Sequence, residues 1–229
     1  MDAPGIKTRW QPGLSGRMDD VQVTILSAEG SLRGKEIPMS EIRAAQQETP
    51  ADAPRPRCLV AFFSRAGLNF WDGEVRNLEI GNTKVLAEKI AARLGADTFE
   101  IVPAHPYPAD PNETHAQSTR ELAEGIYPEL AAPAPSASGY DVVLVGFPVW
   151  CEQVPPVVQT YLKSAGLTDQ LVLPFTTWSG SPKVEIESTF TNLAPEATTG
   201  VPFSVRGENI HEAATDSALE EWLASANLI

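Results

Sequence analysis

From residue 58 onward, short apolar runs rich in strand formers alternate with segments whose apolar residues recur at helical spacing. Strands are predicted at 58–63, 97–102, 141–146, 171–175 and 199–205. Helices are predicted at about 82–94, 113–125, 155–162 and 183–193, with a last one opening at a capping box from Ser217 to Glu220. This alternation predicts a three-layer α/β/α fold, in which helices cover both faces of a five-stranded parallel sheet.

Residues 1–57 follow a different pattern. The run 21–26 alternates weakly and favours a strand, and 40–47 favours a short helix. Residues 48–57 contain several prolines and predict a linker. We therefore expect an N-terminal extension at 1–57 and a globular domain at 58–229, and the sequence assigns no role to the extension.

The charge is spread unevenly between these two parts. Residues 1–57 carry equal numbers of acidic and basic side chains, so the entire net charge of −13 falls on residues 58–229. That acidity disfavours nucleic acid or an anionic membrane as a partner. It suits docking onto a basic protein surface, but it is equally consistent with a charge that only keeps the protein soluble.

Cysteine usage and hydropathy narrow the class of protein. Cys58 and Cys151 do not make a disulfide framework, and Cys58 is expected in the core. No apolar stretch approaches the roughly 18 residues of a membrane span, and no secretory signal is recognised, so a cytoplasmic protein is expected. The three histidines lack metal-ligand spacing, so no metal site is predicted.

Ligands of parallel sheets bind beyond the carboxyl ends of the strands. Three segments follow strand ends and are candidates for the site, and we call them the first (64–67), the second (147–153) and the third segment (176–182). After the first segment and an insert at 68–80, Gly81-Asn82-Thr83 opens a helix. Free N–H groups and the helix dipole would meet there and predict an anion site. Since no lysine is embedded as in a P-loop, a terminal phosphate without a metal fits better than a nucleoside triphosphate. A plain strand-to-helix turn is the alternative.

The other two segments carry tryptophans. Trp150 follows the carboxyl end of a strand, where an indole can stack on an aromatic ligand, although packing under the next helix would also explain it. The third segment contains Thr176-Thr177-Trp178-Ser179-Gly180, whose free backbone N–H groups could approach a polar heterocycle. An ordinary loop with an exposed Trp178 is the alternative. Together the three segments specify a ligand with an anionic tail and a flat aromatic head, which matches flavin mononucleotide (FMN) better than a dinucleotide.

From residue 58, the chain resembles the flavodoxin family, and most closely its branch with a longer phosphate loop. The resembling motifs are Ala61 to Gly67, Gly81 to Thr83, Tyr107-Pro108, Gly146 to Trp150, Pro155, and Pro174 to Ser181. The resemblance implies a flavodoxin-like sheet in the strand order 2-1-3-4-5, non-covalently bound FMN, and one- or two-electron redox chemistry.

The resemblance also implies site residues. The FMN phosphate would be held by Ser64, Arg65, Ala66, Asn82 and Thr83, with Arg65 acting through its backbone. The isoalloxazine ring would be flanked by Pro148, Val149 and Trp150, and its pyrimidine edge contacted by Thr176, Thr177, Trp178, Ser179 and Gly180. No residue is assigned as catalytic, because the flavin carries the electron chemistry.

The chain departs from the usual flavodoxin pattern in three places. The insert 68–80 interrupts the phosphate loop, Cys151 stands where the branch often has a second aromatic residue, and 1–57 has no counterpart. The inserted Asn69-Phe70-Trp71 could cover the phosphate or the ring, or could pack on the surface.

Three functions remain open at this stage. The first, which we favour, is an FMN electron carrier between a reductase and an acceptor, consistent with the cofactor segments and the acidic charge. The second is FMN-dependent oxidation of NAD(P)H with a quinone or another small acceptor, in which the insert would shape a substrate pocket. The third is a binding module that has lost its flavin.

Overall fold

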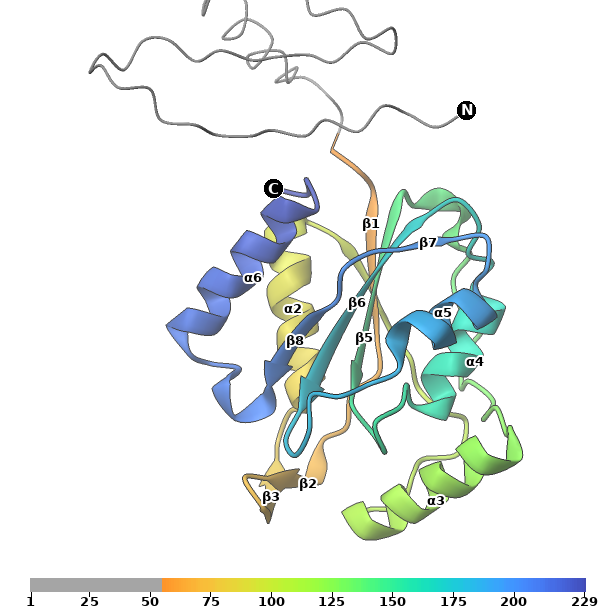
Figure 1. Cartoon of the computed structure of the whole chain (residues 1–229), viewed down its shortest axis with the longest axis vertical. Helices are drawn as coiled ribbons and strands as arrows, with labels where there is room; N and C mark the ends of the chain where they lie inside the picture. Colours follow the sequence, from red (N-terminus) through yellow and green to blue (C-terminus); the bar gives the residue numbers. More distant parts are fainter. Residues whose placement is uncertain (1–54) are drawn as a thin grey trace, which may run out of the picture. The chain divides into compact units, whose positions relative to one another are not determined.

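The computed structural model describes residues 55–229, which form a parallel sheet between two layers of helices (Figure 1). Across the sheet the strands run β4 (Asp97–Glu100), β1 (Cys58–Phe62), β5 (Val142–Pro148) and β6 (Leu171–Trp178). The short strands β7 (Thr198–Thr199) and β8 (Phe203–Arg206) both pair with β6. All of these pairings are parallel, as predicted.

The last strand of the sheet is divided into two pieces. Counted in chain order, with β7 and β8 taken together as the fifth strand, the sheet has the order 2-1-3-4-5 that the resemblance implied. The single strand predicted at 199–205 is interrupted because Pro202, just before β8, has no N–H to donate to the ladder.

Strands β1 and β5 are apolar throughout because both faces of the sheet are covered. In β1, Leu59 and Ala61 contribute to the core on one face, while Val60 and Phe62 contribute to the core on the other. Successive side chains of a strand point to opposite faces, so a doubly covered strand needs a continuous apolar run. Each fully buried Leu or Phe contributes roughly 1.5–3 kcal/mol to folding.

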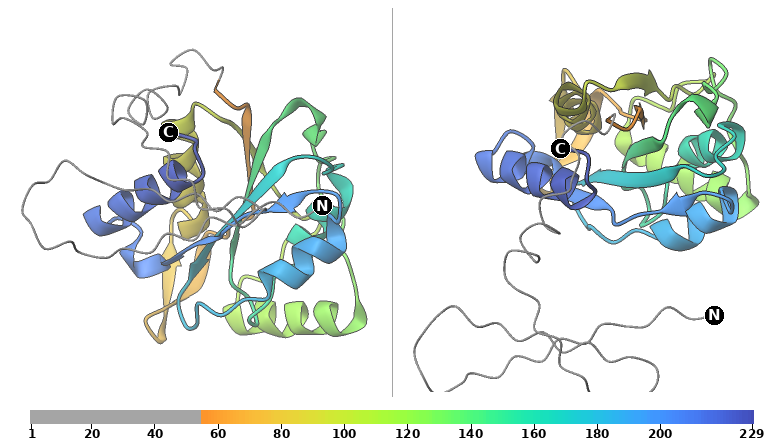
Figure 2. Two further views of the ribbon diagram at one scale, coloured as in Figure 1. Left: turned by 45° about the horizontal axis from the view of Figure 1, so that its top comes forward. Right: turned by 90° about the horizontal axis from the view of Figure 1, so that it is seen from above.

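The helices form one layer on each face of the sheet (Figure 2). The first layer consists of α2 (Asn82–Leu94) and α6 (Ala213–Ser225), and the second contains α4 (Pro156–Ser164) and α5 (Ile186–Leu193). A further helix, α3 (Pro111–Glu124), lies next to α4, and two 3-10 turns occupy Ala137–Gly139 and Gly207–Asn209. Gly95 ends α2 in the left-handed conformation, with φ of 62°, as a glycine C-cap does.

The insert forms an antiparallel hairpin, for which the sequence analysis predicted no structure. Its strands are β2 (Gly67–Trp71) and β3 (Glu74–Leu78). Asp72 and Gly73 connect them with φ of 50° and 84°, which is the conformation of a two-residue type I′ turn. The Asp-Gly pair was therefore a readable hairpin signal.

Several predicted boundaries differ from the structure by two to four residues. The last helix begins at Ala213 rather than at Ser217, whose hydroxyl donates to the Ala213 carbonyl within the helix at 3.2 Å. Strand β6 continues beyond 175 to Trp178, because its ladder with β8 extends to the pair Trp178 and Arg206. The first residues of the third segment are therefore part of the sheet.

Some predictions fall on residues that the structure does not describe. The strand at 21–26, the helix at 40–47 and most of the linker lie outside the described residues, so the boundary at 57/58 stays a prediction. Cys58 is buried in the core, as predicted, and both cysteines are free. None of the helices within residues 55–229 combines the length and the apolarity that a bilayer crossing requires.

Gly146 offers a test of the packing between β5 and β6. A Cβ atom at this position would overlap the ring of Phe175. Gly146→Ala should therefore lower the free energy of unfolding by about 1–3 kcal/mol, as overpacking of a core does, measured by denaturant titration. Gly139→Ala is the matched control, because its Cβ would meet only Arg57 Nη1, at 3.8 Å. Equal effects of the two substitutions would contradict this packing.

Candidate functional site

The first segment lies directly against the N-terminus of α2. Gly81, the N-cap residue of α2, is buried there. A Cβ atom on it would overlap Ser64 Oγ and lie only 2.5 Å from the Arg65 carbonyl oxygen. Ser64 Oγ also accepts a hydrogen bond from Lys84 N at 3.0 Å. The two halves of the interrupted loop thus meet as one unit, and the close approach requires glycine at position 81.

The backbone around this contact is free to bind an anion. No hydrogen bond within residues 55–229 is donated by the N–H groups of Ser64, Arg65, Ala66, Asn82 and Thr83. The last two belong to the first turn of α2, where the helix dipole adds positive potential. This set of uncharged N–H donors suits a phosphate group.

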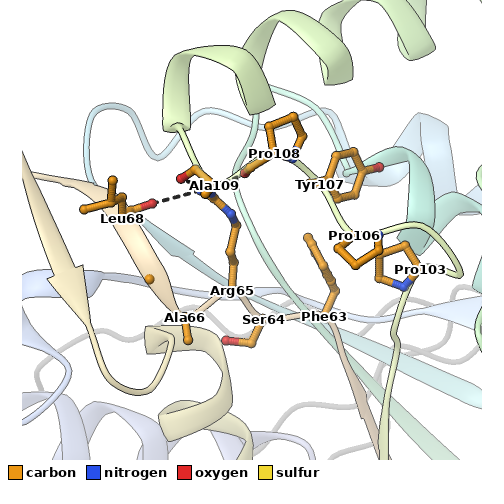
Figure 3. A pocket seen from close by; sticks show the side chains of 11 residues that line it. Phe63, Ser64, Arg65, Ala66, Leu68, Pro103, Pro106, Tyr107, Pro108 and Ala109 are labelled. Atoms are coloured by element: carbon orange, nitrogen blue, oxygen red, sulfur yellow. Dashed lines mark hydrogen bonds between the residues drawn. The ribbon is translucent and has the colours of Figure 1, made fainter.

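The basic side chains of this region are engaged elsewhere. The Arg65 guanidinium donates to the carbonyl oxygens of Leu68 at 2.9 Å and Pro108 at 2.6 Å (Figure 3). Burial lowers the pKa of Arg65, against a smaller opposing effect of a nearby carboxylate. The ammonium of Lys84 pairs with Glu100 at 2.8 Å. What the first segment offers a ligand is therefore mainly its backbone.

A buried pair of hydroxyls ties α2 to the end of β6. Thr83 Oγ1 lies 2.7 Å from Thr177 Oγ1, and both side chains are almost inaccessible to solvent. The Thr177 carbonyl in turn accepts a hydrogen bond from Val149 N at 2.9 Å. These two hydrogen bonds connect the N-terminus of α2 to the third segment and the third segment to the second.

Trp150 connects the second segment to the residue that precedes the first segment. Its half-buried indole packs edge-to-face against Phe63 and Tyr107, with ring centroids 5.2 and 4.9 Å apart. Phe63 directly precedes Ser64, so this contact joins the second segment to the first. Together with the hydrogen bonds described above, it links α2 and all three segments in a closed series of contacts. Three stretches far apart in the sequence therefore converge at one edge of the sheet.

The remaining residues of the second and third segments are partly occupied by internal contacts. Pro148 and Val149 are half-buried at the end of β5, and Gly180 is exposed. The Thr176 hydroxyl donates to β8, at 2.9 Å, and the Ser179 hydroxyl donates to Glu208 Oε1 at 2.7 Å. Trp178 is half-buried, with the Arg206 guanidinium 6.0 Å from its ring. Backbone groups and the Trp178 ring are therefore the main contributions that this segment can make.

A cavity of about 310 Å³ opens beside the first segment (Figure 3). Residues 63–68 form one wall, and Pro103 with residues 106–109 forms the other. The sequence analysis did not include 103–109 among the site segments. The available signal was its position, because it follows the strand at 97–102 and so leaves the same edge of the sheet.

Tyr107 is held firmly in the wall of this cavity. Its hydroxyl donates to Glu121 Oε2 at 2.9 Å, and the buried Glu121 also accepts from Gln117 Nε2 at 2.7 Å. Burial and the hydrogen bond to Glu121 raise the pKa of Tyr107 well above its usual range, so the phenol stays protonated. The ring that packs on Trp150 therefore has a fixed orientation.

The Thr83 and Thr177 pair can be tested by a double-mutant cycle. Thr83→Val leaves the Thr177 hydroxyl buried and unpaired, and should lower the free energy of unfolding by about 1–3 kcal/mol. Thr83→Val/Thr177→Val should cost clearly less than the sum of the two single substitutions, because no unpaired hydroxyl remains. Denaturant titrations give the three values, and simple additivity would show that the two hydroxyls are not paired.

Comparison with known proteins identifies the family of this chain. Residues 77–226 match a family described as Flavodoxin. A provisionally assigned flavoprotein from Bacteroides eggerthii is 25% identical, with a TM-score of 0.59 over 74% of this chain and 97% of that chain. A Lactobacillus acidophilus flavoprotein, solved in complex with FMN, is 22% identical, with a TM-score of 0.51 over 73% and 98%. No curated protein matches significantly. The family match spans more than half of the sequence, and the chain therefore belongs to the flavodoxin family.

Proposed function

We propose that this protein binds FMN non-covalently and carries electrons between a reductase and an acceptor. The observation that carries the proposal is the set of unpaired amides at 64–66 and 82–83, gathered where Gly81 packs against Ser64. Uncharged donors at a helix N-terminus suit a terminal phosphate. Membership of the flavodoxin family and the FMN complex of the Lactobacillus acidophilus protein support FMN as the ligand.

The residues divide into those that hold the phosphate and those that face the ring. The amides of Ser64, Arg65, Ala66, Asn82 and Thr83 bind the phosphate. Pro148, Val149 and Trp150 flank the isoalloxazine ring, and the backbone of 176–180 contacts its pyrimidine edge. Bound FMN supplies one- and two-electron redox chemistry, which no side chain of the site provides. The chain itself binds and orients the cofactor.

The acidity of the domain supports a protein partner. All of the net charge of −13 falls on residues 58–229. Complementary charge accelerates the encounter of two proteins and orients them. We therefore propose a redox partner with a basic docking surface, and an electron-transfer rate that falls as ionic strength rises.

One observation favours a second function, the FMN-dependent oxidation of NAD(P)H with a quinone or another small acceptor. The cavity of about 310 Å³ beside the first segment lies within the size range of small-molecule sites. Its lining includes Phe63, Leu68, Pro103 and Tyr107, which would suit a flat apolar acceptor.

Flavin titration tests the phosphate site. The protein should bind FMN on the order of a hundredfold more tightly than riboflavin, because two hydrogen bonds to a charged group together contribute about 3 kcal/mol. Quenching of flavin fluorescence measures both affinities. Gly81→Ala should remove most of this preference, because its Cβ would displace the first segment, whereas Gly139→Ala should retain it. Equal affinities of the unmodified protein for FMN and riboflavin would refute the site.

Steady-state kinetics separate the two functions. An electron carrier loaded with FMN should oxidise NADH or NADPH only slowly on its own when a quinone is present, and addition of a separate reductase should restore rapid turnover. Absorbance at the nicotinamide band follows the reaction. Rapid turnover by the purified protein alone would exclude a pure carrier and establish the second function.

A further inference from the structure

The β2–β3 hairpin begins and ends at the proposed phosphate site. It leaves the first segment at Gly67, which has a φ of 83°, and returns to α2 through Gly81. At its base, Asn69 Nδ2 donates to the carbonyl oxygens of Arg65 at 3.2 Å and Gly67 at 3.0 Å. Of the three inserted residues considered above, Asn69 and Trp71 are half-buried and Phe70 is exposed. The base of the hairpin is therefore fixed to the phosphate loop.

The tip of the hairpin is fastened to the far side of the site. Asp72 N donates to Glu208 Oε1 at 2.7 Å and to Ser179 Oγ at 3.3 Å. Arg206 Nη2 pairs with Asp72 Oδ1 at 2.6 Å. We refer to these four residues, Asp72, Ser179, Arg206 and Glu208, as the latch. The latch joins the hairpin tip to the end of β8 and to the third segment.

The burial of Glu208 favours the closed state of the latch. Its side chain is only 11% exposed, and its Oε1 accepts from the Asp72 amide and from the Ser179 hydroxyl. Arg206 Nε lies 3.3 Å from Glu208 Oε2, close enough for an ion pair although not aligned for a hydrogen bond. Removal of a hydrogen-bond donor from a buried carboxylate destabilises the folded protein. If the hairpin tip lifted away, Glu208 would lose the hydrogen bond from the Asp72 amide, and Arg206 would lose its ion pair with the Asp72 carboxylate.

We infer that the hairpin is a strap across the cofactor site and that the latch controls how quickly FMN leaves. The inference rests on the proposed function. The base of the strap is fixed at Arg65, which belongs to the proposed phosphate site, and its tip is fixed at Ser179, in the segment proposed to face the ring. A ligand that reaches both segments therefore extends from the base of the strap to its tip. Asp72, Arg206 and Glu208 act as positioning residues, because they hold the strap without needing to touch FMN.

Arg206→Gln tests the latch in two independent measurements. Hydrogen–deuterium exchange of the peptide 67–78, measured without flavin, should become about three- to tenfold faster, as expected for loss of a partly exposed charged hydrogen bond. The rate of FMN dissociation, measured by stopped-flow with a competing apoflavoprotein, should rise by about the same factor. Arg120→Gln is the matched control, because Arg120 is exposed on α3 and has no ion pair within residues 55–229. It should change neither rate.

A second variant guards against a general effect of Arg206 on folding. Asp72→Asn removes the carboxylate but keeps the turn, because asparagine tolerates a positive φ. Its FMN dissociation rate should also rise, and Asp72→Asn/Arg206→Gln should be no faster than Arg206→Gln alone, because Arg206→Gln already removes the ion pair with Asp72.

Each outcome decides the matter. Faster FMN dissociation and faster hydrogen exchange in Arg206→Gln, with neither change in Arg120→Gln, support the latch and the strap. Faster exchange with unchanged FMN dissociation shows that the hairpin is latched but does not retain the cofactor, and overturns the strap. Unchanged exchange overturns the latch. If the unmodified protein does not bind FMN, the proposed function fails and the retention role fails with it, while the exchange measurement still reports on the latch.

Discussion

The close seating of α2 against the first segment is the constraint on which the site depends. Gly81 leaves no room for a side chain beside Ser64, and Ser64 Oγ holds the amide of Lys84. The same helix turn is anchored to β6 through Thr83 and Thr177. A helix fixed in this way presents its free amides in one place, so that little reorganisation is needed when an anion binds. The converging segments beyond the sheet edge derive their positions from this arrangement.

The site presents backbone N–H dipoles, rather than formal positive charges, to an anion. Arg65 and Lys84 are nearby, but their side chains bind carbonyl oxygens and Glu100. A phosphate held only by amides would keep its negative charge, and it would lie in a domain whose net charge is −13. Both effects oppose the addition of further negative charge close by. We therefore expect a low reduction potential for a flavin bound here, and a surface that attracts basic partners.

The sequence predicted what local patterns determine and missed what distant contacts determine. The buried strand 141–146 and helix α2 were recognised because a continuous apolar run and a glycine C-cap are local signals. Ser217 misled because its hydroxyl can also bond back within a helix. The latch between Asp72 and Glu208 joins residues 136 positions apart, and no local pattern encodes it. Loop 103–109 was not counted among the site segments, although its place after a strand was visible and Tyr107-Pro108 is one of the resembling motifs.

Amide chemical shifts of ¹⁵N-labelled protein test the central claim most directly, because they report on each N–H group of the site. On titration with FMN, we predict large downfield shifts for the amides of Ser64, Arg65, Ala66, Asn82 and Thr83, and only small shifts of the same amides with riboflavin. Downfield shifts signify that these groups donate hydrogen bonds to the phosphate. Unchanged positions of these five resonances in a protein that nevertheless binds FMN would contradict the account.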